Sequence, residues 1–381
     1  MASWPFSPEH DELRKSIRAF VETELAPHAS EWEQQRDFPD AVFRRMGELG
    51  FLGLTYPEEY GGGGGDYLCN VVLAEEMTRC NSAGLAMAVA VQTDMAVPPV
   101  FKFGTEEQRH RYLPSAISGH KIFCLGISEP DAGSDVAAVK TTARKVDGGW
   151  RINGRKTFIT NGRRADVMTL VARTDHDAGH QRITLFLVDT ETPGFEVART
   201  LDKLSMHSSD TAEITLTDVF VPDDAMLGSE GEGFYNISWE LQGERLVGAA
   251  GAIAGARRTF ESALEYAGRR TAFGKPIGRH QAVGHALAEM ATEIEAAQQL
   301  VYAAAWKVDR GEYPVREISM AKLLTGRVAW SVADRALQVF GGFGYAADSP
   351  VSRAWRDARL IRIGAGTDEV MREVIGRIEG L

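Results

Sequence analysis

The chain has 381 residues, 44% apolar and 25% charged, which are the proportions of an ordinary globular protein and exclude a disordered or fibrous chain. Its net charge of −11 excludes a general nucleic-acid binder and argues against attraction to anionic membranes. The cysteines Cys69, Cys80 and Cys124 have no CxxC spacing, so the sequence predicts no metal site and no disulfide framework, and it favours a reducing, cytoplasmic location. We expect neither secretion nor membrane insertion, because the first residues lack an apolar signal core and the longest apolar runs are about half a bilayer span.

The first zone, residues 1–120, has the hydrophobic period of helices. Ser7 before Pro8 is typical of a helix start, with an N-cap followed by proline at the first helical position. Further helices are predicted over residues 39–50, 66–79, 83–103 and 105–117. Five glycines at 61–65 separate two of these helices. Since they follow no strand and lack a P-loop lysine, a flexible connector is favoured over an anion-binding loop.

The second zone, residues 121–226, changes to the composition of strands. Segments 167–172, 182–189 and 212–221 are rich in β-branched and aromatic residues and are separated by Gly, Asp and Pro turns. The zone therefore predicts a compact antiparallel β-domain, either a small barrel or a sandwich.

The third zone, residues 227–381, returns to long helices, predicted over 239–269, 282–309 and 315–340. Within the first of them, residues 246–256 are almost all Gly or Ala, which allows close approach of either a neighbouring helix or a ligand. Tight helix packing is favoured. The chain is thus expected to be an α+β multidomain protein, with a β-domain between an N-terminal helical domain and a C-terminal domain like a four-helix bundle. No GxGxxG follows a strand, which disfavours a Rossmann nicotinamide enzyme.

Short motifs recur in order along nearly the whole chain. They are GISEPDAGSD at 126–135, NGRKTFITN at 153–161, RTAFGKPI from 270 with Gln281, QVFGGFGY at 338–345, and Arg356-Asp357 followed by GTDE at 366–369. Together they resemble the acyl-CoA dehydrogenase family. The resemblance implies that family's three-domain fold and an FAD enzyme that oxidises an acyl-CoA thioester to the trans-2-enoyl-CoA.

The resemblance also implies which residues bind the cofactor and the substrate. The cofactor-binding positions are Ile127, Ser128, Ser134, Phe158, Thr160, Arg270, Phe273, Gln281, Gln338, Gly341, Gly342, Thr367 and Glu369. In the family, the positions from Arg270 to Gly342 in this list bind partly the FAD of a neighbouring subunit. Phe158 stands where the family often has Trp, and the alternative is a core strand residue. Ser134, Arg245 and Gly366 are expected to contact the substrate, with Arg245 ordering the ligand or its own helix.

Many family members place the catalytic carboxylate directly before the C-terminal Gly-Thr, where this chain has Ala365. The isovaleryl-CoA and long-chain branch carries it instead in an x-E-R-[LI] motif, which residues 243–246 match, so the resemblance assigns the base to Glu244. Glu240, one turn earlier on the same face, is the alternative carboxylate, and a simple ion pair of Glu244 with an Arg is the structural alternative. The backbone N–H of Ala365 and a flavin ribityl hydroxyl would hold the thioester carbonyl.

The resemblance further implies a homotetramer built as a dimer of dimers and an electron-transferring flavoprotein as electron acceptor. The expected substrate is a medium-chain, long-chain or branched acyl-CoA. Three alternatives remain open: a flavin oxidase or monooxygenase, a dehydrogenase of acyl groups on a carrier protein, and an inactive acyl-CoA-binding scaffold. Cys124 is expected to be a small buried thiol.

Overall fold

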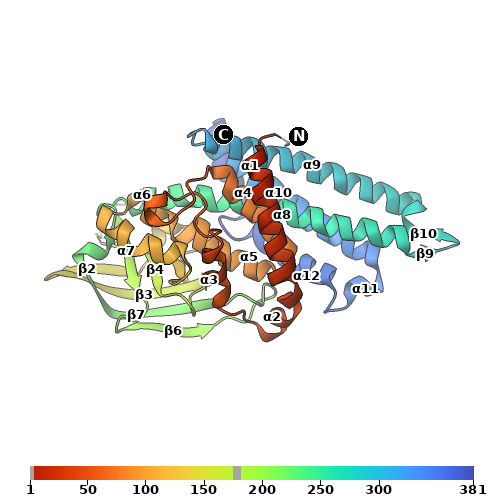
Figure 1. Cartoon of the computed structure of the whole chain (residues 1–381). Coiled ribbons are helices and arrows are strands. Elements are labelled where there is room, and N and C mark those ends of the chain that lie inside the picture. Colours follow the sequence, from red (N-terminus) through yellow and green to blue (C-terminus); the bar gives the residue numbers. More distant parts are fainter. Residues whose placement is uncertain (1–3, 175–181) are drawn as a thin grey trace.

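The structure is a computed structural model that describes residues 4–174 and 182–381. Its N-terminal part is helical and packs against the C-terminal helices, while a β-sheet lies at one end of the molecule (Figure 1). The N-terminal helices are α1 (Pro8–Phe20), α2 (Ala29–Gln35), α3 (Ala41–Glu48), α4 (Tyr67–Met77), α5 (Ala83–Ala90), α6 (Pro98–Phe103) and α7 (Glu106–Ile117). The predicted helices of this zone are confirmed.

Local chemistry explains where these helices begin. Thr105 accepts the Gln108 N–H at 3.2 Å, and the Gln108 side chain accepts the Thr105 N–H at 2.9 Å, which is a complete capping box for α7. The glycines 61–65 do form a connector, but an ordered one. Gly63 and Gly65 donate to the carbonyls of Gly53 and Leu54, each at 2.8 Å, so the expectation of a flexible connector is wrong.

The helical run Ala83–Phe103 contains a π-helical turn, η5 (Val91–Ala96), between α5 and α6. It is the one helix in the described residues that is long and apolar enough to cross a membrane. Because 72% of its apolar window is buried inside the protein, it fits a core helix. The π turn inserts an extra residue and carries Thr93 and Asp94, a pattern frequent at functional sites.

The middle zone is one eight-stranded sheet in the order β6-β7-β3-β2-β4-β5-β8, with β1 also on β4. The strands are β1 (Phe123–Gly126), β2 (Thr142–Val146), β3 (Gly149–Thr160), β4 (Val167–Arg173), β5 (Ile183–Asp189), β6 (Phe195–Thr200), β7 (Thr211–Pro222) and β8 (Met226–Leu227). The predicted strands are confirmed. The pairing is not wholly antiparallel, however, because β1 runs parallel to β4 and contributes the strand that leads into residue 127.

The C-terminal part contains α8 (Gly233–Arg269), the hairpin β9 (Thr271–Ala272) and β10 (Lys275–Pro276), α9 (Gln281–Asp309), α10 (Val315–Phe340), α11 (Gly342–Tyr345), α12 (Pro350–Asp357) and α13 (Asp368–Glu379). Helices α8, α9 and α10 pack on one another, and α13 packs on α10. Helix α8 starts earlier than the predicted residue 239. A Cβ on Gly233 would lie 2.8 Å from the Ile183 carbonyl, so glycine lets the helix begin against β5.

The helices at the two ends of the chain share one hydrophobic core. Ile17 and Val71 from the N-terminal helices belong to the same buried cluster as Ile253 and Ile294 from α8 and α9. The sheet has its own cluster, in which Ile152 of β3 is fully buried. A further buried cluster joins strand residues such as Val167 to Leu113 of α7, so the sheet also packs directly on the helices. The predicted α+β fold with its bundle-like C-terminal domain is confirmed.

Candidate active site

A cavity of about 360 Å³ lies between α4, α5 and η5 on one side and α8, α10 and α12 on the other. Its size is typical of a small-molecule site. On α8 the small residues Gly248, Gly251, Ala252 and Gly255 line it, while Ile253 on another face of the helix is fully buried. Tight helix packing, predicted for residues 246–256, therefore describes only part of this segment, and the rest faces a cavity.

The cavity follows α8 from Val247 to Ser262, which at 1.5 Å per residue is roughly 22 Å. Its wall is mostly apolar. The N-terminal end of this run carries Thr93 and Asp94 from η5, and the far end carries Arg258 and Thr259. A long and mostly apolar cavity of this kind fits an extended alkyl chain.

Glu244 lies one turn before the cavity, on the same helix. Burial raises the pKa of its carboxyl to about 7, although the nearby charges of Arg245 and Lys322 pull it down. Glu244 forms no ion pair within residues 4–174 and 182–381; its neighbour Arg245 donates to the Ala365 carbonyl at 2.9 Å. The alternative of a simple Glu–Arg pair is therefore not what the structure shows.

Glu240 is 1% exposed, and neither of its carboxyl oxygens has a hydrogen-bond partner among the described residues. Burial first, and then the charge of Glu244, hold the pKa of Glu240 well above its usual range. Asp94 is buried on the facing π turn, and burial raises its pKa to about 7. Of Glu240 and Glu244, the second is thus the one whose pKa lies near neutral pH.

The loop before α13 is held from several sides. Ala365 and Gly366 have φ of +55° and +95°, in the left-handed region. Arg245 holds the Ala365 carbonyl, the buried Lys322 Nζ donates to the Gly366 carbonyl, and Arg362 pairs with Asp368 at 2.7 Å across the loop. No acceptor for the Ala365 N–H occurs in the described part of the chain. This N–H is free to donate to a ligand.

The first group of predicted cofactor residues lies in the middle zone and consists of Ile127, Ser128, Ser134, Phe158 and Thr160. Phe158 lies at an irregularity of β3 with φ of +61° and is 69% exposed, so the alternative of a core strand residue is wrong. Ser134 is exposed, Thr160 is half-buried, and the Ser128 carbonyl accepts the Thr157 N–H at 2.9 Å. Ile127, Ser128 and Phe158 are thereby brought together by the pairing of this segment with β3.

A buried ion pair fixes that pairing. The fully buried Lys156 Nζ lies 2.8 Å from Glu129 and 3.0 Å from the Ile127 carbonyl. Glu129 also accepts the N–H groups of Lys140 and Thr141, at 2.6 and 3.0 Å. The Glu and the Lys of two motifs, 126–135 and 153–161, therefore meet in the folded chain.

The second group of predicted cofactor residues lies elsewhere. Phe273, 94% exposed with φ of +51°, sits on the β9–β10 hairpin near Arg270 and Gln281. Gln338, Gly341 and Gly342 are exposed at the end of α10. Figure 1 shows the hairpin and α11 at the end of the long helices away from the sheet. One chain therefore does not bring this group to Phe158.

The predicted cofactor residues Thr367 and Glu369 lie at the start of α13. Thr367 is the N-cap and accepts the Val370 N–H at 3.2 Å, while Glu369 is exposed in the first turn. The Cys124 thiol is fully buried, and burial raises its pKa far above the usual range. A small buried thiol, as expected, describes it.

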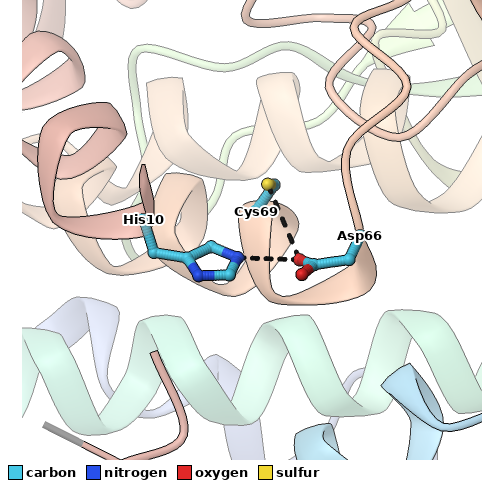
Figure 2. A group of neighbouring side chains, drawn as sticks. All are labelled: His10, Asp66 and Cys69. Carbon is cyan, nitrogen blue, oxygen red and sulfur yellow. Dashed lines mark hydrogen bonds and ion pairs between the residues drawn. The ribbon is translucent and has the colours of Figure 1, made fainter. Parts of the chain in front are cut away.

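His10, Asp66 and Cys69 offer ligand atoms within 4.8 Å of one another (Figure 2). The His10 Nε2 lies 2.8 Å from Asp66, and the Cys69 thiol donates to Asp66 at 3.7 Å. Because the His10 Nδ1 accepts the Ser7 N–H at 3.0 Å, the neutral ring carries its proton on Nε2 and donates it to Asp66. A metal on Nε2 would have to break this arrangement. We interpret the group as a hydrogen-bonded tie between α1 and α4.

The sequence analysis missed Asp94 and Lys322, and it missed the pairing of Lys156 with Glu129. Asp94 carried a signal, because it is the one acid in the apolar run 83–103, and so did Lys322, which is the one lysine of the 315–340 helix and is flanked by apolar residues. A charge in a stretch that is otherwise core needs a buried partner or a function.

Comparison with known proteins places this site in a family. Sequence models of the N-terminal, middle and C-terminal domains of acyl-CoA dehydrogenases match residues 7–120, 124–219 and 231–379. The mitochondrial isovaleryl-CoA dehydrogenase of Oryza sativa subsp. japonica is 38% identical over 98% of this chain and 91% of its own length. An acyl-CoA dehydrogenase structure from Geobacillus kaustophilus matches with a TM-score of 0.97 and 38% identity over 100% of both chains. The FAD complex of PigA matches with a TM-score of 0.96 and 29% identity, also over 100% of both chains. The chain belongs to the acyl-CoA dehydrogenase family of oxidoreductases.

Proposed function

We propose that this protein dehydrogenates a long-chain acyl-CoA to the trans-2-enoyl-CoA, with Glu244 as the base. The observation that carries the proposal is the position of Glu244, a carboxyl with a pKa near 7 at the head of a long apolar cavity, in an acyl-CoA dehydrogenase fold. The direct test is anaerobic mixing of the purified protein with acyl-CoAs of several lengths while the flavin absorbance is followed. Bleaching supports the proposal, and no bleaching by any acyl-CoA contradicts it.

The cofactor is FAD, and the residues present fit it. An exposed, left-handed Phe158 beside the backbone of Ile127 and Ser128 is a suitable wall for an aromatic ring system. Gly341 has φ of +58°, and a Cβ there or on Gly342 would meet nothing within 4 Å, which leaves room for a phosphate or ribose. When bound, FAD supplies the two-electron oxidant that takes the β-hydrogen as hydride.

The protein's own residues supply the proton chemistry. Glu244 removes the α-proton of the thioester and holds it on its carboxylate. The free N–H of Ala365 donates to the thioester oxygen, where negative charge develops as the proton leaves. The apolar cavity excludes water from the acyl chain, which strengthens both interactions. Alanine at position 365 does not deprive the site of a base, because the proposed base is Glu244. Residue 365 contributes only its backbone N–H.

The pH dependence of flavin reduction follows from Glu244. Only the ionised carboxylate accepts a proton, so below a pH of about 7 the rate should fall about tenfold per pH unit, and above that pH it should level off. Stopped-flow measurement of flavin reduction at saturating acyl-CoA between about pH 5 and about pH 9 checks this. A rate that is already flat from about pH 5.5 would indicate a base with an ordinary carboxyl pKa.

Chain-length preference follows from the cavity. The Gly255→Leu variant should lower kcat/KM for palmitoyl-CoA by about 100-fold, because it blocks several methylene sites worth about 0.8 kcal/mol each, and leave butyryl-CoA within about threefold. A Cβ added at Gly255 or at Gly268 would meet no atom within 4 Å, but Gly268 lies outside this cavity, so Gly268→Leu is the matched control. Equal losses for both substrates would contradict an acyl-binding role.

We further propose a homotetramer, built as a dimer of dimers, in which the end of one chain completes the FAD site of another. The exposed aromatics Phe273, Phe343 and Tyr345, at 94%, 67% and 86% exposure, are unusual on a monomer's surface and support a partner there. Sedimentation velocity tests the assembly. The proposed electron acceptor is an electron-transferring flavoprotein. Fast flavin reoxidation in air with peroxide release would instead indicate an oxidase.

A further inference from the structure

Lys322 is a buried cation with no role yet assigned. It lies within α10 with 0% of its surface exposed, and its Nζ donates to the Gly366 carbonyl. The described residues contain no carboxylate within ion-pair distance of it. Burying an ammonium group without such a partner is costly, so its retention at this loop needs an explanation.

The loop whose carbonyl Lys322 binds has an unfavourable backbone conformation. Ala365 and Gly366 are consecutive left-handed residues, and this conformation is unfavourable for a non-glycine residue such as Ala365. Arg245 on α8 binds the carbonyl of the first, and Lys322 on α10 binds the carbonyl of the second. Two consecutive carbonyls anchored from two helices fix the peptide planes of the loop, and with them the direction of the Ala365 N–H.

Lys322 also faces the base. Its charge and that of Arg245 both lower the pKa of Glu244 against the effect of burial. Other charged groups around this point are Asp368 and Glu369 on α13, Glu240 on α8 and Asp94 on η5. Burial lowers the pKa of Lys322 itself to about 8, so the ammonium form still dominates at neutral pH.

We propose that Lys322 is a positioning residue for the dehydrogenation: it holds residues 365–366 so that the Ala365 N–H meets the thioester oxygen. The proposal rests on the proposed function. It differs from a structural role because it predicts an effect that depends on the ligand's carbonyl group.

The test compares two ligands on the FAD-loaded protein by isothermal titration calorimetry. The enoyl-CoA product has the thioester oxygen, whereas an S-alkyl-CoA thioether of the same length lacks it. Lys322→Met should weaken enoyl-CoA binding by about tenfold and leave thioether binding unchanged, because only the enoyl-CoA uses the Ala365 N–H. Lys307→Met, which removes a more exposed lysine paired with Glu317, is the control and should change neither affinity.

A second variant keeps the hydrogen bond. Lys322→Gln retains an N–H donor and should regain part of the enoyl-CoA affinity that Lys322→Met loses. If Lys322→Met does not fold, Lys322→Gln, whose side chain is shorter, should still lose more enoyl-CoA affinity than thioether affinity. Equal loss of both ligands in the folded variant overturns the proposal. Failure of the wild type to reduce its flavin would instead overturn the proposed function.

Discussion

Replacing Glu244 with glutamine should slow flavin reduction by acyl-CoA by about 10²–10⁴-fold, the contribution typical of a positioned general base. Glutamine keeps the size and polarity of the side chain but cannot take the α-proton. Acyl-CoA affinity should change little, since the cavity and the Ala365 N–H remain. Anaerobic stopped-flow mixing gives the rate, and calorimetry with the enoyl-CoA gives the affinity.

The matched control is Glu240→Gln, one turn away on the same helix. Because burial raises the pKa of Glu240 and its carboxyl oxygens have no hydrogen-bond partner among the described residues, a neutral amide fits the same surroundings and should cost less than about tenfold in rate. If Glu240→Gln abolished reduction while Glu244→Gln kept the wild-type rate, the base would be Glu240. Loss of activity in both variants with loss of FAD would indicate damage to the fold.

Most of the helices and strands could be predicted from local sequence patterns. The predicted ranges 105–117 and 315–340 match α7 and α10 nearly to the residue, because helix caps and apolar periodicity act within one or two helical turns. The start of α8 was missed, because the reason for a glycine at position 233 is a contact with β5. A Cβ there would have no space, and the sequence does not show this contact. The π turn at Thr93 and Asp94 is equally a product of packing rather than of local propensity.

The site residues could be predicted only where one short segment of the chain carries a recognisable motif. The motif around Glu244 predicts the base, but the support of Ala365 comes from Arg245, 120 residues away, and that of Gly366 from Lys322, 44 residues away. No local pattern encodes such contacts. The exposed left-handed Phe158 depends on an irregular pairing of β3 with β7. The group near Phe273 lies away from Phe158 within one chain, and the proposal that it serves a second chain rests on the family resemblance and on its exposed aromatic residues.

The Lys156–Glu129 pair shows why two separate motifs contain a Lys and a Glu. The Lys156 ammonium group is fully buried and reaches both Glu129 and the Ile127 carbonyl, so it ties the segment 127–129 to β3 behind Phe158. Removing one member of a buried pair leaves the other charge without compensation, which typically costs about 3–5 kcal/mol. The same change loosens the backbone that the FAD ring would rest on.

We therefore expect Lys156→Met to lower the free energy of unfolding by about 3–5 kcal/mol and to release FAD more readily. Lys140→Met is the matched control, because it removes an exposed lysine from the pair with Asp131 and should cost less than about 1 kcal/mol. Adding Glu129→Gln to Lys156→Met removes the stranded charge, so the double variant should be less destabilised than the two single losses combined. Urea unfolding of the FAD-loaded protein gives the free energies, and flavin lost on filtration gives the retention. Equal, small losses for Lys156→Met and Lys140→Met would mean that solvent or backbone rearrangement replaces the buried pair, and that the flavin edge is held by β-pairing alone.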